Sequence, residues 1–262
     1  MRRDVLELRQ FYASDLGRAA RAMVNRKVTE AWDDAHGQDV LGLGYATPYL
    51  SGLEPRARRV VAAMPAQQGV EVWPAGRRNL TTLVAEDALP FSNAFFDRIL
   101  AVHAIEEAPD PVGLLREVWR VLSPSGRVII VVASRNGPWA NVENTPFGHG
   151  RPYTRAQLAE LLREAELEPS GWTRALYVPP IAWMARWAEG FEQVGSRISP
   201  GISGLMLMEA VKQTFAVKPR AARVRRRAVR PVLAPAPGGA APVSRDRQAR
   251  KLAGLGDAAR KP

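Results

Sequence analysis

The chain has 262 residues, of which 46% are hydrophobic, so it is long enough for one large α/β domain or two small ones. It contains no cysteine and only three widely spaced histidines, which excludes disulfides and thiol nucleophiles and predicts no metal site. Its net charge of +11 is uneven, because residues 218–262 hold 13 Lys and Arg against two acidic residues while residues 1–217 are neutral.

Residues 1–36 predict a helical N-terminal cap. Apolar residues recur at helical spacing through residues 4–33, and Gly37 follows this region. The first residues are charged and amphipathic and contain no secretory apolar stretch, and no run in the chain is long enough to span a bilayer. We therefore expect a cytoplasmic protein without a membrane span.

A glycine turn follows within Asp39–Leu50, whose sequence is DVLGLGYATPYL. A short apolar strand leads into Gly42 and Gly44, and a helix begins near Pro48, since proline is tolerated in the first turn of a helix. A strand, a glycine turn and a helix in this order are typical of a nucleotide-binding site, in which unpaired backbone N–H groups face the ligand. A tight turn in some other α/β protein is the alternative, because Thr47 stands where the full fingerprint has its third glycine.

Strands and helices alternate after this turn, which predicts a parallel sheet with right-handed crossovers. We expect strands at Arg58–Ala63, Asn79–Val84, Phe95–Val102 and Arg127–Ala133, and a loop or short strand at Gly69–Pro74. A helix begins at Asp110-Pro111, with proline at its first position. The fourth of these strands reads RVIIVVA, the continuous apolar run that is typical of a strand buried on both faces.

The C-terminal part begins with a long loop rich in glycine and proline, residues 134–153. The elements expected after it are a helix at Arg155–Glu166, a strand at Gly171–Val178, a helix at Ile181–Val194 and a last strand at Gly204–Val211. Residues 218–262 contain almost no large apolar residues, so we expect a disordered basic tail. Its arginine run, residues 223–230, predicts weak, non-specific contact with polyanions, and a nucleic-acid binder acting through this tail is one functional hypothesis.

Residues 86–132 carry the most specific pattern. Leu89-Pro90-Phe91 precedes the strand FFDRIL, and a helix ends in EVWRVLSPSG at Glu117–Gly126. This order resembles the class I S-adenosylmethionine-dependent methyltransferases of the small-molecule type, in which the helix ends in E-x-x-R-V-L-x-P-G-G. The resemblance implies a three-layer α/β sandwich over residues 1–217, with a mostly parallel, Rossmann-like seven-stranded sheet whose last strand is antiparallel.

The resemblance also implies S-adenosylmethionine as the cofactor, held over the carboxyl ends of the first four strands. Its methionine part would lie against the glycine turn, its adenine beside the loop before Leu89, and its methyl group on the side of Val102. The cofactor-binding residues that the resemblance implies are Gly42, Gly44, Tyr45, Ala46, Met64, Pro65, Glu86, Asp87, Leu89, Val102 and His103.

Two positions depart from the family pattern. The acidic residue that precedes the glycines falls near residues 41–42, which are not acidic, and the last glycine is Ala46. No acid ends the second strand, where the family holds the ribose hydroxyls; Met64-Pro65 stands there, and Gln67 or Gln68 is the nearest polar candidate. A carboxylate at that place makes charge-assisted bonds worth about 1.5–3 kcal/mol each. The chain therefore either holds the cofactor differently or does not bind it.

His103 is the candidate catalytic residue, because it ends a strand beside Glu106 and Glu107 and could take a proton from an acceptor. The alternative is a structural histidine that bonds a neighbouring loop. Residues 134–153 are the candidate substrate site, because cationic and aromatic side chains suit an anionic or planar acceptor; a lid packed on itself is the alternative. The substrate-binding residues expected are Arg135, Trp139, Phe147, Arg151 and Tyr153.

Methyl transfer from a sulfonium needs mainly alignment and the exclusion of water, so no side chain is a compulsory catalyst. The resemblance therefore predicts an enzyme that transfers a methyl group from S-adenosylmethionine to a small-molecule acceptor by in-line displacement. The alternative is a non-catalytic protein of the same fold that binds a partner or another ligand, which the missing acid and the altered glycine turn favour.

Overall fold

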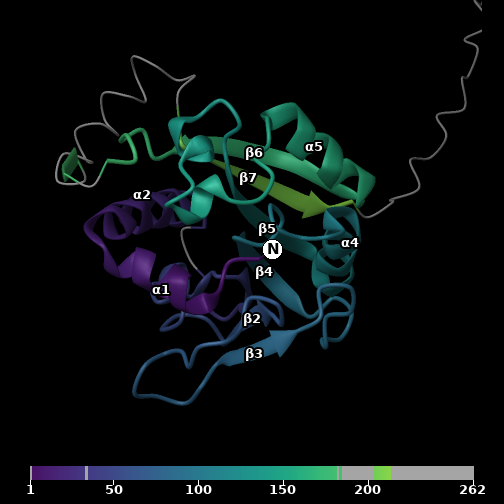
Figure 1. Cartoon of the computed structure of the whole chain (residues 1–262). Coiled ribbons are helices and arrows are strands. Elements are labelled where there is room, and N and C mark those ends of the chain that lie inside the picture. Colours follow the sequence, from purple (N-terminus) through teal and green to yellow (C-terminus); the bar gives the residue numbers. More distant parts are fainter. Residues whose placement is uncertain (1, 33–34, 182, 185–202, 214–262) are drawn as a thin grey trace, which may run out of the picture. The chain divides into compact units, whose positions relative to one another are not determined.

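The structure, a computed structural model, describes residues 2–32, 35–181, 183–184 and 203–213. Seven strands form one sheet in the order β3-β2-β1-β4-β5-β7-β6 (Figure 1). Their bounds are β1 Asp39–Gly44, β2 Arg59–Pro65, β3 Thr81–Val84, β4 Phe96–Val102, β5 Leu122–Ala133, β6 Leu167–Ala175 and β7 Leu205–Lys212. Strands β1 to β5 pair in parallel, and β7 is antiparallel to both β5 and β6. The mostly parallel seven-stranded sheet with an antiparallel last strand is confirmed.

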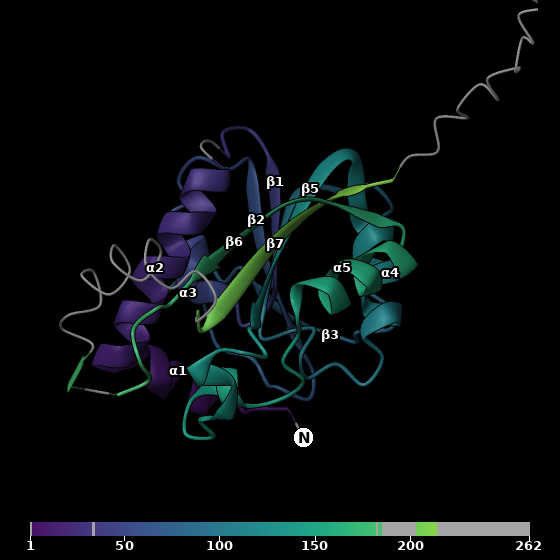
Figure 2. The ribbon, with the colours of Figure 1, turned by 90° about the horizontal axis from the view of Figure 1, so that it is seen from above.

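Helices cover the two faces of this sheet (Figure 2). The bounds are α1 Val5–Ala13, α2 Asp15–Ala31 and α3 Thr47–Leu50 on one face, and α4 Pro111–Val121 and α5 Arg155–Glu164 on the other. Two short 3-10 helices, Pro138–Asn141 and Pro146–Gly148, lie in the loop after β5. Successive side chains of β1 lie on opposite faces of the sheet. Val40 packs with the first group of helices, and Leu41 packs with the second.

The helix starts follow from local chemistry. Asp110 accepts a hydrogen bond from the Gly113 amide and Pro111 occupies the first turn, so α4 begins where the sequence predicts. Thr154 and Gln157 form a reciprocal capping box at the start of α5. Each cap satisfies a backbone donor that has no partner within the helix.

The predicted helix over residues 4–33 is wrong in one respect, because it is two helices that meet at Ser14. Ser14 is extended, with φ −74° and ψ 162°, and its side chain accepts from the Gly17 amide to begin α2. A Cβ on Gly17 would lie 2.0 Å from the carbonyl oxygen of Phe11, so the corner closes only around a residue without a side chain. The apolar periodicity continues across this corner, and therefore does not reveal it.

Of the two alternatives expected for residues 69–74, the structure shows the loop. Two other expectations differ from the structure or lie outside its described residues. The strand expected at Gly171–Val178 begins earlier, at Leu167, and ends at Ala175, because β6 pairs with β7 from Leu167 onward with a register shift near Pro169. Most of the helix expected at Ile181–Val194 lies outside the described residues, as does the tail, so the domain boundary near residue 217 stays a prediction.

Candidate functional site

The turn after β1 packs directly on the end of β4. Gly44 has φ +79°, and a Cβ there would lie 2.2 Å from the carbonyl oxygen of Val102. The amide of Tyr45 donates to that same oxygen at 2.8 Å. Because β1 and β4 are parallel neighbours, their carboxyl ends share one edge of the sheet. The fold therefore brings together Gly44, Tyr45, Val102 and His103, four of the residues expected at the cofactor site.

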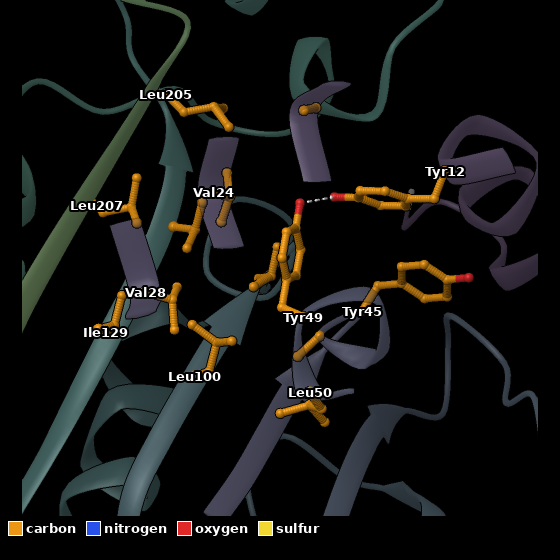
Figure 3. Packing of buried hydrophobic residues seen from close by; sticks show 14 of the residues in the cluster. Tyr12, Val24, Val28, Tyr45, Tyr49, Leu50, Leu100, Ile129, Leu205 and Leu207 are labelled. Carbon is orange, nitrogen blue, oxygen red and sulfur yellow. Dashed lines mark hydrogen bonds between the residues drawn. The ribbon is translucent and has the colours of Figure 1, made fainter. Parts of the chain in front are cut away.

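His103, the first residue after β4, is 2% exposed and has a φ of +51°, a backbone conformation that is uncommon for a residue with a side chain. Its Nε2 shares a hydrogen bond of 2.9 Å with the hydroxyl of Tyr12 from α1. The Tyr12 hydroxyl also bonds that of Tyr49 from α3 at 2.8 Å, and the Tyr12 ring stacks on Tyr45 (Figure 3). These rings close over the glycine turn.

The three polar groups in this layer are uncharged at neutral pH. Burial, with the Arg2 and Arg3 guanidinium groups adding to it, lowers the pKa of His103 to about 3. Burial raises the pKa of Tyr12 and of Tyr49 well above the usual value for tyrosine. The Tyr49–Tyr12–His103 chain is therefore a neutral hydrogen-bonded network.

Arg2 reaches the same strand ends from the start of the chain. Its guanidinium donates to the carbonyl oxygens of His103, at 2.9 Å, and of Ala104, at 3.1 Å, and it pairs with the carboxylate of Glu86. The Arg2 side chain is fully buried in this position. Burial raises the pKa of Glu86, and the Arg2 charge acts against that rise. Nothing in the sequence pattern marks Arg2, because its partners lie 84 to 102 positions away along the chain.

A cleft of about 410 Å³ lies beside this ion pair. It opens between the ends of β2 and β3 and the start of α4, and its walls include Pro65, Glu86 and Asp87. Gln68 follows β2 and is 1% exposed, yet neither its side-chain nitrogen nor its side-chain oxygen has a hydrogen-bond partner among the described residues. An unpaired buried polar group costs about 1–3 kcal/mol. Gln68 does not itself line the cleft, but its neighbour Gln67 does.

Glu106 is a second buried group without a full set of partners. Its side-chain Oε2 bonds nothing among the described residues. Burial raises the pKa of Glu106 to about 8. Its backbone oxygen accepts from the amide of Arg151, which ties the loop after β5 to the end of β4.

Four other residues expected at the cofactor site make packing contacts instead. Gly42, Ala46, Met64 and Leu89 are buried and do not line the cleft. A Cβ on Gly42 would lie 2.6 Å from the Leu50 Cδ1, so this glycine lets α3 pack on β1. The Leu89 amide donates to Glu117 at 2.7 Å, which fastens the turn before β4 to α4. Their contacts are those of packing residues.

Some of the expected substrate residues are buried, and the others are exposed. Trp139, Phe147 and Tyr153 are buried: the Trp139 indole donates to the Val178 oxygen at 2.7 Å, and the Phe147 ring lies 4.6 Å from that of His103. Arg135 and Arg151 are exposed at the surface. The buried rings match the alternative of a lid packed on itself, while Phe147 makes this lid one wall of the His103 layer. Their role in binding an acceptor stays a prediction.

The described residues contain no group of three His, Cys, Asp or Glu side chains that could hold a metal ion. Within the same residues, no helix combines the length and the apolar character needed to cross a membrane.

Comparisons with known proteins give one family model and several uncharacterized relatives. A family model described as a methyltransferase domain matches residues 39–130. Uncharacterized proteins of Mycobacterium bovis and Mycobacterium tuberculosis are 27% identical over 139 residues, which cover 50% of this chain and 47% of theirs. The chain thus spans about half the length of the curated relatives it matches.

Solved structures show the same fold. A SAM-dependent methyltransferase of Thermotoga maritima has a TM-score of 0.55 at 18% identity, over 80% of this chain and 96% of the other. The Burkholderia thailandensis 1,6-didemethyltoxoflavin-N1-methyltransferase, solved with S-adenosylhomocysteine, has a TM-score of 0.50 at 22% identity, over 76% and 79%. The [4+2]-cyclase SpnF has a TM-score of 0.51 at 21% identity, over 72% and 79%.

Proposed function

We propose that this chain, whose residues 39–130 match a methyltransferase domain model, binds S-adenosylmethionine and transfers the methyl group to a small-molecule acceptor. The observation that carries the proposal is the cleft at the ends of β2 and β3. Gln68, the residue after the lining residue Gln67, is buried, and its side-chain amide has no partner among the described residues. A volume of about 410 Å³ falls within the roughly 300–1,000 Å³ of ligand pockets.

The residues of the cleft suit an adenosyl group. Glu86 and Asp87 offer acceptors to an exocyclic amine, and Pro65 and Leu114 offer apolar walls to a flat ring. The Gln68 amide carries both donors and an acceptor, so it can bond two neighbouring hydroxyls as the usual carboxylate would. A neutral amide makes weaker bonds than a carboxylate, and we expect weaker cofactor binding than a chain with the acid would have.

The end of β4 suits a cationic amine. The carbonyl oxygens of His103 and Ala104 accept from the guanidinium of Arg2, which stands at this place as a cation with several N–H donors. An amino-acid ammonium group has the same charge and donors, so these two oxygens fit the methionine end of the cofactor once Arg2 withdraws.

The cofactor, when bound, supplies a methyl group on a sulfonium leaving group. The chain's contribution is to hold the acceptor in line and to exclude water, which the layer of Tyr45, His103 and Phe147 supports because these side chains are buried. His103 stays the proposed base: its Nε2 is neutral and can accept a proton. With a pKa of about 3 it is a weak base, so we favour an acceptor whose attacking atom needs no deprotonation, such as a neutral amine.

Calorimetry and thermal unfolding of the full chain with S-adenosylmethionine and with S-adenosylhomocysteine test the proposal. We expect heat of binding and a raised Tm with both ligands, and a smaller effect of ATP, which shares the adenosyl group but lacks the methionine part. The absence of heat and of any Tm shift at millimolar S-adenosylmethionine and S-adenosylhomocysteine would remove it.

A second candidate is a protein of this fold that binds a partner or another ligand without methyl transfer. Arg2 and Tyr12 close the methionine end of the site, which favours this candidate, and the similar fold of a [4+2]-cyclase illustrates other chemistry on the same scaffold. Release of S-adenosylhomocysteine during turnover would count against it. The tail's contact with polyanions and the cytoplasmic location stay predictions.

A further inference from the structure

The first residues of the chain lie across the loops that follow β2, β3 and β4. Here residues 2–13 are called the N-terminal segment. Arg2 bonds the His103 and Ala104 oxygens and pairs with Glu86, and the Val5 amide donates to the Gln68 backbone oxygen at 2.8 Å. At the end of α1, Tyr12 bonds His103. The Tyr12 ring also stacks on Tyr45, the residue after β1, so one short segment contacts all four strand ends that form the site.

These contacts use the groups that the proposed cofactor needs. Glu86 lines the cleft, and the two carbonyl oxygens are the candidates for the amine. Val5 bonds the backbone oxygen of Gln68, and the Gln68 side-chain amide has no partner among the described residues. A carbonyl oxygen or carboxylate that holds a buried guanidinium is not free for another cation in the same space. Arg2 and the methionine end of the cofactor therefore exclude one another.

The hold of the N-terminal segment on the body is incomplete. The Arg2 Nε and the Arg3 Nε are buried without a hydrogen-bond partner among the described residues. The helix α1 has nine residues, which is too short to be stable apart from what it packs against. Release of the segment unpacks nine helical residues, of which Val5, Leu8 and Tyr12 belong to the core, and the unpaired buried donors lower the cost of that release.

We infer that the N-terminal segment is an autoinhibitory plug, in which Arg2 occupies the amino-acid end of the cofactor site and must leave before the cofactor can bind. The inference rests on the proposed function, since it concerns the same site. Only the open fraction of the protein binds, so the apparent dissociation constant exceeds the intrinsic one by the inverse of that fraction.

Titration of the full chain with S-adenosylhomocysteine tests the plug. The variants are Arg2→Ala, which removes all three guanidinium contacts, and Arg2→Lys, which keeps the charge without the planar fork. Arg18→Ala is the matched control, because it removes an equal charge at an exposed position of α2, outside the N-terminal segment, where Arg18 pairs with Asp15. We expect Arg2→Ala to bind about tenfold more tightly than the wild type, which corresponds to roughly 1.4 kcal/mol. Arg2→Lys should lie between them, and Arg18→Ala should match the wild type.

Hydrogen exchange gives a readout that does not depend on affinity. Saturating S-adenosylhomocysteine should speed the exchange of the Val5 amide and of the α1 amides, because the plug has left, while amides of β1 and β4 exchange more slowly. Equal or weaker binding by Arg2→Ala, or slower exchange in the N-terminal segment on binding, would overturn the plug and leave the proposed function standing. No binding by any variant would overturn both.

Discussion

The hydroxyl of Tyr12 lies 2.9 Å from the Nε2 of His103, so a side chain of α1 is bonded to the residue that directly follows β4. Both groups are buried, and the bond joins positions 91 residues apart. Since burial lowers the pKa of His103 to about 3, the imidazole is neutral at pH 7 and this bond persists without a buried charge.

Replacing Tyr12 by phenylalanine should destabilise the fold. Tyr12→Phe keeps the stacked ring but leaves both the His103 Nε2 and the Tyr49 hydroxyl without their partner, at a cost of about 1–3 kcal/mol in the free energy of unfolding. Tyr49→Phe is the matched control, because it keeps the bond between Tyr12 and His103 and should cost less. Urea denaturation measures both. A Tyr12→Phe variant as stable as the wild type would contradict the role of the network.

Gly44 should tolerate no side chain. Gly44→Ala puts a Cβ within 2.2 Å of the Val102 oxygen at a φ of +79°, and we expect a loss of about 2–4 kcal/mol in the free energy of unfolding. Gly52→Ala is the control, because a Cβ there meets nothing within 4 Å, and it should change stability by about 0.5 kcal/mol at most. Similar midpoints of chemical denaturation for the two variants would refute this account of the turn.

Two buried groups give the stability opposite pH dependences. The pKa of His103 is lowered from 6.5 to about 3, so between these values the unfolded chain takes up a proton that the folded protein does not, and the free energy of unfolding falls as the pH falls. The pKa of Glu106 is raised from 4.5 to about 8, so the free energy of unfolding falls as the pH rises through that range. Between pH 4.5 and 6.5 the two effects oppose each other, so we expect the free energy of unfolding to be constant there. Urea denaturation at a series of pH values measures this plateau.

The decline in the free energy of unfolding above the plateau is caused by Glu106, and a substitution of Glu106 tests this. Glu106→Gln should remove a slope of about 1.4 kcal/mol per pH unit between pH 6.5 and 8, because the amide has no proton to lose. Glu160→Gln, at an exposed position of α5, should keep the wild-type profile. If Glu106→Gln keeps the decline above the plateau, another group causes it.

Gln68 should matter for binding more than for folding. Gln68→Leu removes two unpaired polar atoms from a buried place, so the variant should be as stable as the wild type or more so. Under the proposed function it should weaken the binding of S-adenosylhomocysteine by about 1–3 kcal/mol, or five- to 150-fold. Gln67→Leu, at an exposed neighbouring position that lines the cleft, should have a smaller effect on calorimetric affinity. Equal losses in the two variants would count against Gln68 as the ribose contact.

Features carried by neighbouring residues could be predicted from the sequence. The start of α4 needs only Asp110 to accept from Gly113 and proline to follow it, and the strand of Arg127–Ala133 needs only its apolar run. The glycine turn could be predicted for the same reason, since Gly44 adopts a conformation that glycine favours. The pairing of this turn with the end of β4 then followed from the expected parallel order of the strands.

The candidate site could be predicted only in part. Pro65, Glu86 and Asp87 do line the cleft, because the carboxyl ends of neighbouring parallel strands meet at one edge. Met64 is instead buried in the core, since side chains alternate along a strand. Leu89 is buried because its turn needs an apolar anchor. The corner at Ser14, which sends α1 across the strand ends, depends on the absence of a side chain at Gly17, and helical periodicity does not detect it.

The sequence by itself determined the order of strands and helices and the family they indicate, because capping, apolar periodicity and glycine turns act over a few residues. Only the tertiary structure decided that Arg2 and Tyr12 cover the end of β4 and that Gln68 is buried with no side-chain partner among the described residues. Those contacts join residues far apart along the chain, and their geometry exists only after the sheet has assembled and burial has removed water from the groups that meet there.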